Sequence, residues 1–172
     1  INPVKRGAHI EELIHVPSAE QVCTLLEYGK GVIKIITLAP EQVNEELIHL
    51  IQSYGVVVSA GHSNAGYAVA KKGFKSGIHA VTHLFNAMSP LLHREPGLVG
   101  ATMDDEQVMA SIIPDGHHVD YAAIRIAKAV MKERLLPSAE FEVKWYLLKN
   151  LIQKKENLEY SEDEINDLEA KD

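Results

Sequence analysis

Short apolar runs rich in β-branched residues alternate with amphipathic stretches along the first 135 residues of the chain. The apolar runs have the length and composition of buried strands, and the stretches between them have helical spacing. Strands are predicted at residues 31–40, 56–60, 78–82 and 108–114, and helices from Ser18 to Gly29, over 41–55, from Ser63 or Asn64 to Gly77, and over 121–135. This alternation predicts a parallel sheet with helices packed outside it.

The pattern contains four strand–helix units in a chain of 172 residues. A complete (β/α)₈ barrel needs roughly 250 residues. The predicted fold is therefore α/β, a partial TIM-type (β/α) barrel with parallel strands. Residues 86–105 contain prolines and glycines and are predicted to form a long loop, of a length that is usually functional.

The end of the chain differs in composition from the rest. Residues 138–172 hold ten acidic residues and five lysines, whereas residues 1–137 hold fourteen acids and twelve bases. We therefore expect a barrel segment at 1–136 and an acidic, α-helical tail at 137–172. Because an incomplete barrel leaves open sheet edges, the tail is expected to cover one of them, or the chain to associate.

Composition excludes several classes of partner. A net charge of −7 and a pI near 5.7, with no basic patch, argue against nucleic acid. A single cysteine, Cys23, excludes a disulfide framework and favours a reducing compartment, so a cytoplasmic location is expected. No apolar run is long enough for a membrane span. The first residue is Ile1 rather than Met, which indicates that the chain begins inside a longer protein.

Three histidine-bearing segments directly follow predicted strands, where α/β folds place their chemistry. They are GHSNA with His62, THLFNAM with His83, and DGHHV with His117 and His118. Neighbouring strands lie about 4.8 Å apart, so imidazoles at adjacent strand ends can converge on one ion. A lone histidine is more often structural, but for this pair we predict a divalent metal ion, Zn²⁺ or Fe²⁺. Residues 1–137 offer no evident carboxylate as a third ligand.

The other candidate residues each allow two interpretations. Only one of His117 and His118 should face a pocket, because adjacent residues on an extended segment point to opposite sides. Arg94 suits bidentate contact with a phosphate, and a surface ion pair with Glu95 is an equally good interpretation. Asn86-Ala87 could bind substrate oxygens or form an ordinary turn. For the basic cluster of Lys5, Arg6 and His9, a solvated loop is the simpler interpretation.

Together, the segments GHSNA, THLFNAMSPLLHREPGLVGA and DGHHV resemble the N-acetylglucosamine-6-phosphate deacetylases of the amidohydrolase superfamily. KRGAH and VIKIITLAPE extend the resemblance, which runs from about residue 1 to about residue 136. It implies a metal-dependent (β/α)₈ barrel beside a small β-sandwich. It also implies hydrolysis of the N-acetyl group of N-acetylglucosamine 6-phosphate to glucosamine 6-phosphate and acetate.

The resemblance further implies roles for single residues. His62 and His83 would be metal ligands, and His118 would be catalytic by helping to hold the developing oxyanion. The amino-sugar phosphate would be bound by His9, Asn86, Ala87 and His118. Arg94 would reach the phosphate of a substrate in the neighbouring subunit, which implies a homodimer.

Two parts of the family pattern have no counterpart in these 172 residues. They are a glutamate ligand in an EGPF-like segment, expected before Ile1, and a general-base aspartate on a strand after the helix at 121–135. Asp115 is not placed to replace that base. We therefore expect very low activity from this chain alone. One alternative is a non-catalytic, truncated sugar-phosphate or metal binder. Another is a different amidohydrolase, such as a dihydroorotase-like enzyme, but the segments LFNAM and HREPG argue against it.

Overall fold

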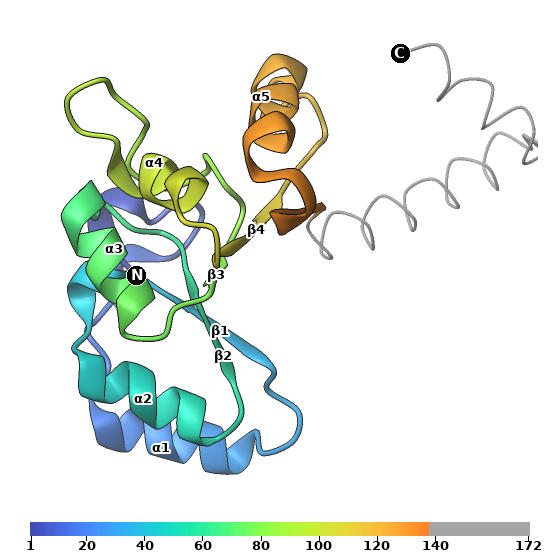
Figure 1. The fold of residues 1–172 in the computed structure, drawn as a ribbon. Coiled ribbons are helices and arrows are strands. Elements are labelled where there is room, and N and C mark those ends of the chain that lie inside the picture. The colour runs from blue at the N-terminus through green and yellow to red at the C-terminus, as the bar shows by residue number, and fades with distance from the viewer. Residues whose placement is uncertain (138–172) are drawn as a thin grey trace, which may run out of the picture. The chain divides into compact units, whose positions relative to one another are not determined.

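A computed structural model of the chain describes residues 1–137, which hold a five-stranded parallel sheet (Figure 1). Its strands are β1 (Ile35–Leu38), β2 (Val57–Ala60), β3 (Ala80–Val81), β4 (Met109–Ile112) and β5 (Leu135–Pro137), and their order in the sheet is their order in the chain. The register aligns Ala60 with Val81 and Val81 with Ala110. The carboxyl ends of β2 and β3 therefore lie level at one edge of the sheet, and β4 continues two residues further, to Ile112.

The prediction of an α/β fold with parallel strands is confirmed. In a doubly wound sheet the strand order reverses at some point. Here every strand pairs with the next one along the chain, as the strands of a (β/α) barrel do. The boundary of the predicted barrel segment, at residue 136, stays a prediction. The helical tail predicted at 137–172 lies almost entirely outside the described residues.

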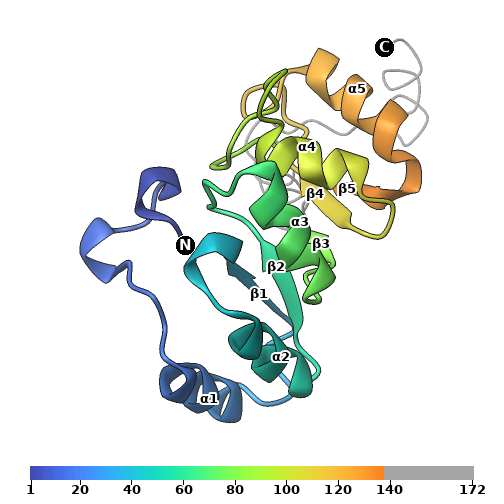
Figure 2. The ribbon, with the colours of Figure 1, turned by 60° about the vertical axis from the view of Figure 1, so that its left-hand side comes forward.

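Three of the five helices in residues 1–137 begin after a residue whose side chain caps them. The five are α1 (Ala19–Tyr28), α2 (Glu45–Ser53), α3 (Tyr67–Lys75), α4 (Gly97–Asp104) and α5 (Tyr121–Met131). Ser18 caps α1, and its capping box with Gln21 is complete. Asn44 caps α2, so that helix begins later than predicted, after a 3₁₀ turn at Pro40–Gln42. Helices α1 and α2 lie side by side in both views of the ribbon (Figure 2).

The prediction of a structureless loop over residues 86–105 is wrong in its second half, which forms α4. Six of the eight residues of this helix are buried. It therefore has no polar face, and the amphipathic period that reveals a surface helix is absent. Pro96 precedes the helix, and Gly97 opens it with a φ of +61° that a side chain would strain.

The predicted helix over 121–135 ends early, at Met131. Lys132 takes a positive φ of 50°, a 3₁₀ turn follows over Lys132–Arg134, and β5 then pairs with β4. Arg134 donates to the carbonyl groups of Thr102, Met103, Asp105 and Val108 around the end of α4. The carbonyls of Thr102, Met103 and Asp105 attract a cation because they lie at the negative end of the helix.

One continuous hydrophobic core joins the sheet to the helices. Leu26 of α1, Ile51 of α2, Val58 of β2 and Val108 beside β4 are all almost fully buried in it. The polar strand-end residues thus sit on a packed scaffold rather than on free loops. Within residues 1–137, no helix has both the length and the apolar character to cross a membrane.

Candidate metal and sugar-phosphate site

The structure brings His62 and His83 together, each two residues beyond the end of its strand. Their Nε2 atoms lie 2.9 Å apart, and their ring centroids are 4.7 Å apart. Both residues have positive φ, 48° for His62 and 42° for His83. Such a conformation costs a side-chain-bearing residue about 1–3 kcal/mol. The turns are therefore held by contacts with neighbouring segments.

The N-terminal segment holds His62 in place. Because a carbonyl oxygen can only accept, the Nδ1–H of His62 donates to the Lys5 carbonyl at 2.9 Å. The backbone N–H of Asn2 donates to the His62 carbonyl at 2.7 Å. Gly7 lies so close that a Cβ there would come within 3.2 Å of the His62 ring. The neutral ring therefore carries its lone pair on Nε2, the atom that faces His83.

Glu41, which our sequence reasoning did not single out, ties three segments together. Its carboxylate accepts hydrogen bonds from the Asn2 side-chain amide at 3.0 Å, the Ser63 hydroxyl at 2.7 Å and the Asn64 backbone N–H at 2.6 Å. It stands directly after the first strand of the pattern, in the LAPE segment, and a carboxylate at a strand end was the signal available in the sequence.

On the other side of the site, Ser111 of β4 holds His83. Its hydroxyl accepts from the backbone N–H of His83 at 2.8 Å, and its carbonyl accepts from that of Leu84 at 2.7 Å. Below the histidines, the hydroxyls of Thr37, Ser59 and Thr82 form a hydrogen-bonded chain across β1, β2 and the end of β3. Ser111 thus holds the backbone of the His83 turn, and the hydroxyl chain links β1, β2 and the residue after β3.

His9, Asn86 and Ala87 lie beside this pair. The His9 ring packs edge-on against His62 with centroids 4.5 Å apart, and its Nδ1 bonds to the Arg6 carbonyl at 2.8 Å. Ala87 has a φ of 47°, and its carbonyl accepts from the Ser63 N–H at 3.1 Å. The loop that carries Asn86 and Ala87 is therefore attached to the loop that carries His62.

Arg94 lies on the loop before α4, and Glu95 is engaged elsewhere. The Glu95 carboxylate accepts from the backbone N–H groups of Tyr67 at 2.7 Å and Gly97 at 3.1 Å, at the starts of α3 and α4. These bonds lower the pKa of Glu95, that of Tyr67 most. Arg94 makes no ion pair within residues 1–137, so the alternative of a pair with Glu95 is not observed.

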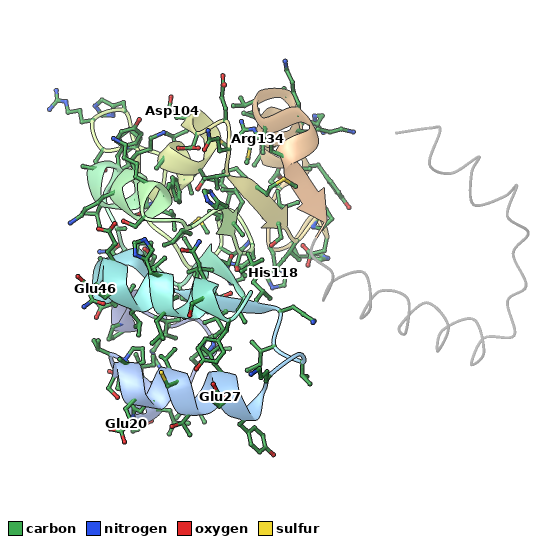
Figure 3. The ribbon with its side chains drawn as sticks, turned by 60° about the horizontal axis from the view of Figure 1, so that its bottom comes forward. Glu20, Glu27, Glu46, Asp104, His118 and Arg134 are labelled. Atoms are coloured by element: carbon green, nitrogen blue, oxygen red, sulfur yellow. The ribbon has the colours of Figure 1, made fainter. Side chains whose placement is uncertain are left out.

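His118 differs from His117 in having a carboxylate partner. Its Nδ1 lies 2.6 Å from Oδ2 of Asp115, while His117 contacts that carboxylate only through its backbone N–H. Both histidines are exposed on the segment between β4 and α5, where Figure 3 labels His118. Within residues 1–137, the hydrogen bonds of His118 run to Asp115.

The histidine pair fits part of a metal site. Burial lowers the pKa of His62 most, and the nearby His83, His9 and N-terminal amine lower it further. The hydrogen bond to the Lys5 carbonyl raises this pKa but does not outweigh them. The ring therefore stays in the neutral, metal-binding form. Two imidazoles on one tetrahedral Zn²⁺ have nitrogens about 3.3 Å apart, so the 2.9 Å spacing would open by only a few tenths of an ångström. No group of three or more His, Cys, Asp or Glu within residues 1–137 is arranged to hold an ion.

Comparison with known proteins shows which family this chain is similar to. The chain is 40% identical over 135 residues to the N-acetylglucosamine-6-phosphate deacetylase of Danio rerio, and 35% identical over 128 residues to that of Bacillus subtilis. These matches cover 74% of the chain and 33% and 32% of the relatives. The resemblance to N-acetylglucosamine-6-phosphate deacetylases is confirmed. An N-acetylgalactosamine-6-phosphate deacetylase of Escherichia coli O157:H7 is also similar, at 33% identity over 135 residues.

Solved deacetylase structures agree with these matches. The crystal structure of the N-acetylglucosamine-6-phosphate deacetylase of Pasteurella multocida aligns with a TM-score of 0.71 at 42% identity, over 78% of this chain and 36% of that one. A mutant of the Mycobacterium smegmatis deacetylase in complex with N-acetyl-D-glucosamine-6-phosphate aligns with a TM-score of 0.78 at 34% identity. No protein-family model matches the chain. The chain spans about a third of the length of these deacetylases.

Proposed function

We propose that this chain is a segment of a metal-dependent deacetylase that acts on an N-acetylhexosamine 6-phosphate, N-acetylglucosamine 6-phosphate first among them. The convergence of the His62 and His83 Nε2 atoms carries the proposal. Relatives that share this stretch at 33–40% identity act, by name, on N-acetylglucosamine or N-acetylgalactosamine 6-phosphate. The proposed class of activity is therefore amide hydrolysis on a phosphorylated amino sugar.

In this proposal His62 and His83 hold a divalent ion, Zn²⁺ or Fe²⁺. When bound, such an ion lowers the pKa of a water molecule and polarises an amide carbonyl. The Lys5 carbonyl keeps the His62 lone pair on Nε2, ready to ligate. His9, Asn86 and Ala87 bind the sugar next to this pair, and the exposed Arg94 binds a phosphate, which in a homodimer would belong to the neighbouring subunit.

The described residues do not supply a third protein ligand, and no aspartate follows α5 in β5. A catalytic zinc usually has three protein ligands, and deacetylation needs a group that moves a proton from water to the leaving amine. We therefore propose that this polypeptide by itself binds the amino-sugar phosphate but hydrolyses it very slowly. A cytoplasmic location also stays a prediction.

The test measures acetate release from N-acetylglucosamine 6-phosphate and N-acetylgalactosamine 6-phosphate with added Zn²⁺ or Fe²⁺, and metal binding in parallel. We expect metal binding that His62→Asn and His83→Asn each weaken strongly, with very slow turnover. His49→Asn is the matched control, because His49 is an exposed histidine of α2 whose ion pair, within residues 1–137, is with Glu45. Metal binding that survives both site substitutions would overturn the proposal, and fast turnover would overturn the predicted impairment.

A non-catalytic sugar-phosphate binder is the second candidate, and the missing third ligand favours it. Calorimetry with glucosamine 6-phosphate separates the two. Binding without any acetate release supports the binder, whereas metal-dependent release supports the enzyme. Absence of both binding and release would count against either function for this chain.

A further inference from the structure

Asp115 is the most heavily hydrogen-bonded carboxylate near the end of β4. Its Oδ1 accepts from the backbone N–H groups of His117 at 2.9 Å and His118 at 2.7 Å, and its Oδ2 lies 2.6 Å from Nδ1 of His118. Gly116 takes a φ of +72°, which allows the chain to turn back so that one carboxylate reaches all three groups. The Asp115 side chain is 18% exposed, so the exposed His118 ring is held by a carboxylate that is itself half-buried.

The direction of the side-chain bond follows from the chemistry of its two atoms. An ionised carboxylate can only accept, so Nδ1 of His118 must carry the hydrogen. Burial by itself would raise the pKa of Asp115, but the bonds from the His118 ring and from the two backbone N–H groups hold that pKa well below its usual range. The carboxylate is therefore ionised whenever the neighbouring imidazole is neutral.

We propose that Asp115 is a positioning residue that fixes the tautomer of His118, so that the neutral ring keeps its proton on Nδ1 and presents the Nε2 lone pair to a ligand. The identity of that ligand, an amino-sugar phosphate, rests on the proposed function. The tautomer itself rests only on the three contacts of Asp115.

This assignment changes what His118 can do in the site. With the proton on Nδ1, the neutral ring accepts a hydrogen bond at Nε2 from a sugar hydroxyl or a water molecule. It has no N–H at Nε2 to offer to a developing oxyanion. The oxyanion role that the family resemblance implies therefore requires the doubly protonated ring, with a second proton at Nε2.

The test is the ¹⁵N spectrum of the histidine rings in the full chain, recorded at a pH where the His118 ring is neutral. His118→Gln assigns its signals, and His117→Gln is the matched control that should leave them in place. We expect His118 to show a protonated Nδ1 and an unprotonated Nε2. Isolated neutral imidazole side chains favour the proton on Nε2, so this pattern is diagnostic.

Asp115→Asn gives the sharpest outcome. The Asn oxygen can still accept from the two backbone N–H groups, while its NH₂ group now faces Nδ1 as a donor. We expect the tautomer to reverse, with the His118 proton moving to Nε2. The backbone amide signals of residues 117 and 118 should stay near their positions, which shows that the turn is kept.

Two results would overturn the inference: a neutral His118 with its proton on Nε2 in the unsubstituted chain, or an unchanged tautomer in Asp115→Asn. Glucosamine 6-phosphate is then added to the unsubstituted protein. A shift of the His118 Nε2 signal supports the ligand half of the inference. No shift at any histidine counts against the proposed function, while the tautomer result stands on the ligand-free spectra.

Discussion

Gly7 offers the most direct test of how the N-terminal segment controls His62. Its φ is +58°, and a Cβ built on it would meet Cε1 of the His62 ring at 3.2 Å, which is shorter than the ordinary contact range of 3.4–4 Å. The change Gly7→Ala should therefore act twice. It strains the backbone, and it pushes the imidazole away from the Lys5 carbonyl that orients it.

The two effects have different sizes. An alanine in the left-handed region costs about 1–2 kcal/mol of stability. Displacing the partner that orients a metal-ligating histidine typically weakens metal binding 10–100-fold. Because the methyl group needs only a few tenths of an ångström, we expect the lower end, about tenfold, which corresponds to about 1.4 kcal/mol of binding free energy.

Gly31→Ala is the matched control for this change. Gly31 has a φ of +76°, and nothing lies within 4 Å of a Cβ built there. Urea unfolding should show a similar loss of stability for both variants. Competition with a Zn²⁺ chelator should show weaker metal binding for Gly7→Ala alone. Equal Zn²⁺ affinity in the two variants would refute the idea that the N-terminal segment positions His62.

Further predictions concern the groups that hold the site loops. Glu41→Gln keeps the size of the side chain but sets an NH₂ group against one of its three donors, so unfolding free energy measured in urea should fall by about 1–3 kcal/mol. Ser111→Ala leaves the His83 N–H without its acceptor, and we expect a similar loss together with weaker Zn²⁺ binding in the chelator assay. Glu95→Ala removes the acceptor of the Tyr67 and Gly97 N–H groups, so it should speed proteolysis of the loop before α4. It should also weaken binding of glucosamine 6-phosphate more than binding of glucosamine. Glu95→Gln should have smaller effects in both assays. Hydrogen bonds from Tyr67 lower the folded-state pKa of both Glu95 and Asp104. Their stabilisation is therefore present above the unfolded pKa values, near 4, and is lost as pH falls through the lower folded values, so the urea midpoint should drop between pH 5 and pH 2.

Much of the fold could be predicted from the sequence because its signals are local. β-Branched runs marked β1, β2 and β4, and Ser18 with Gln21 marked the start of α1. The exceptions have a tertiary cause. Helix α4 is buried over its first six residues and so lacks an amphipathic period, and α5 stops at Met131 because the chain turns to add β5 beside β4.

In the candidate site, too, some features could be predicted from the sequence and others depend on the folded chain. The pairing of His62 with His83 could be predicted, because strand ends of a parallel sheet meet at one edge. The groups that orient them could not. Lys5 acts through its backbone carbonyl, which no side-chain pattern reveals, and Glu41 acts on segments 22 and 39 residues away in the sequence.

The two interpretations of Arg94 show a further limit of sequence reasoning. Composition left an ion pair with Glu95 and a phosphate contact equally good, since the residues are adjacent. The structure commits Glu95 to the backbone N–H groups of Tyr67 and Gly97. A choice between a neighbour in the sequence and a neighbour in space depends on where α3 and α4 begin, which is a property of the folded chain.

Four of the five non-glycine residues with positive φ in the described chain lie in the two histidine loops: His62, His83, Phe85 and Ala87. Glycine would occupy each position without steric penalty, so every substitution to glycine there would relax the backbone. On warming, these loops should therefore lose their shape before the sheet melts. Loss of metal binding on heating would then precede global denaturation, and Ala87→Gly would narrow the temperature interval between the two.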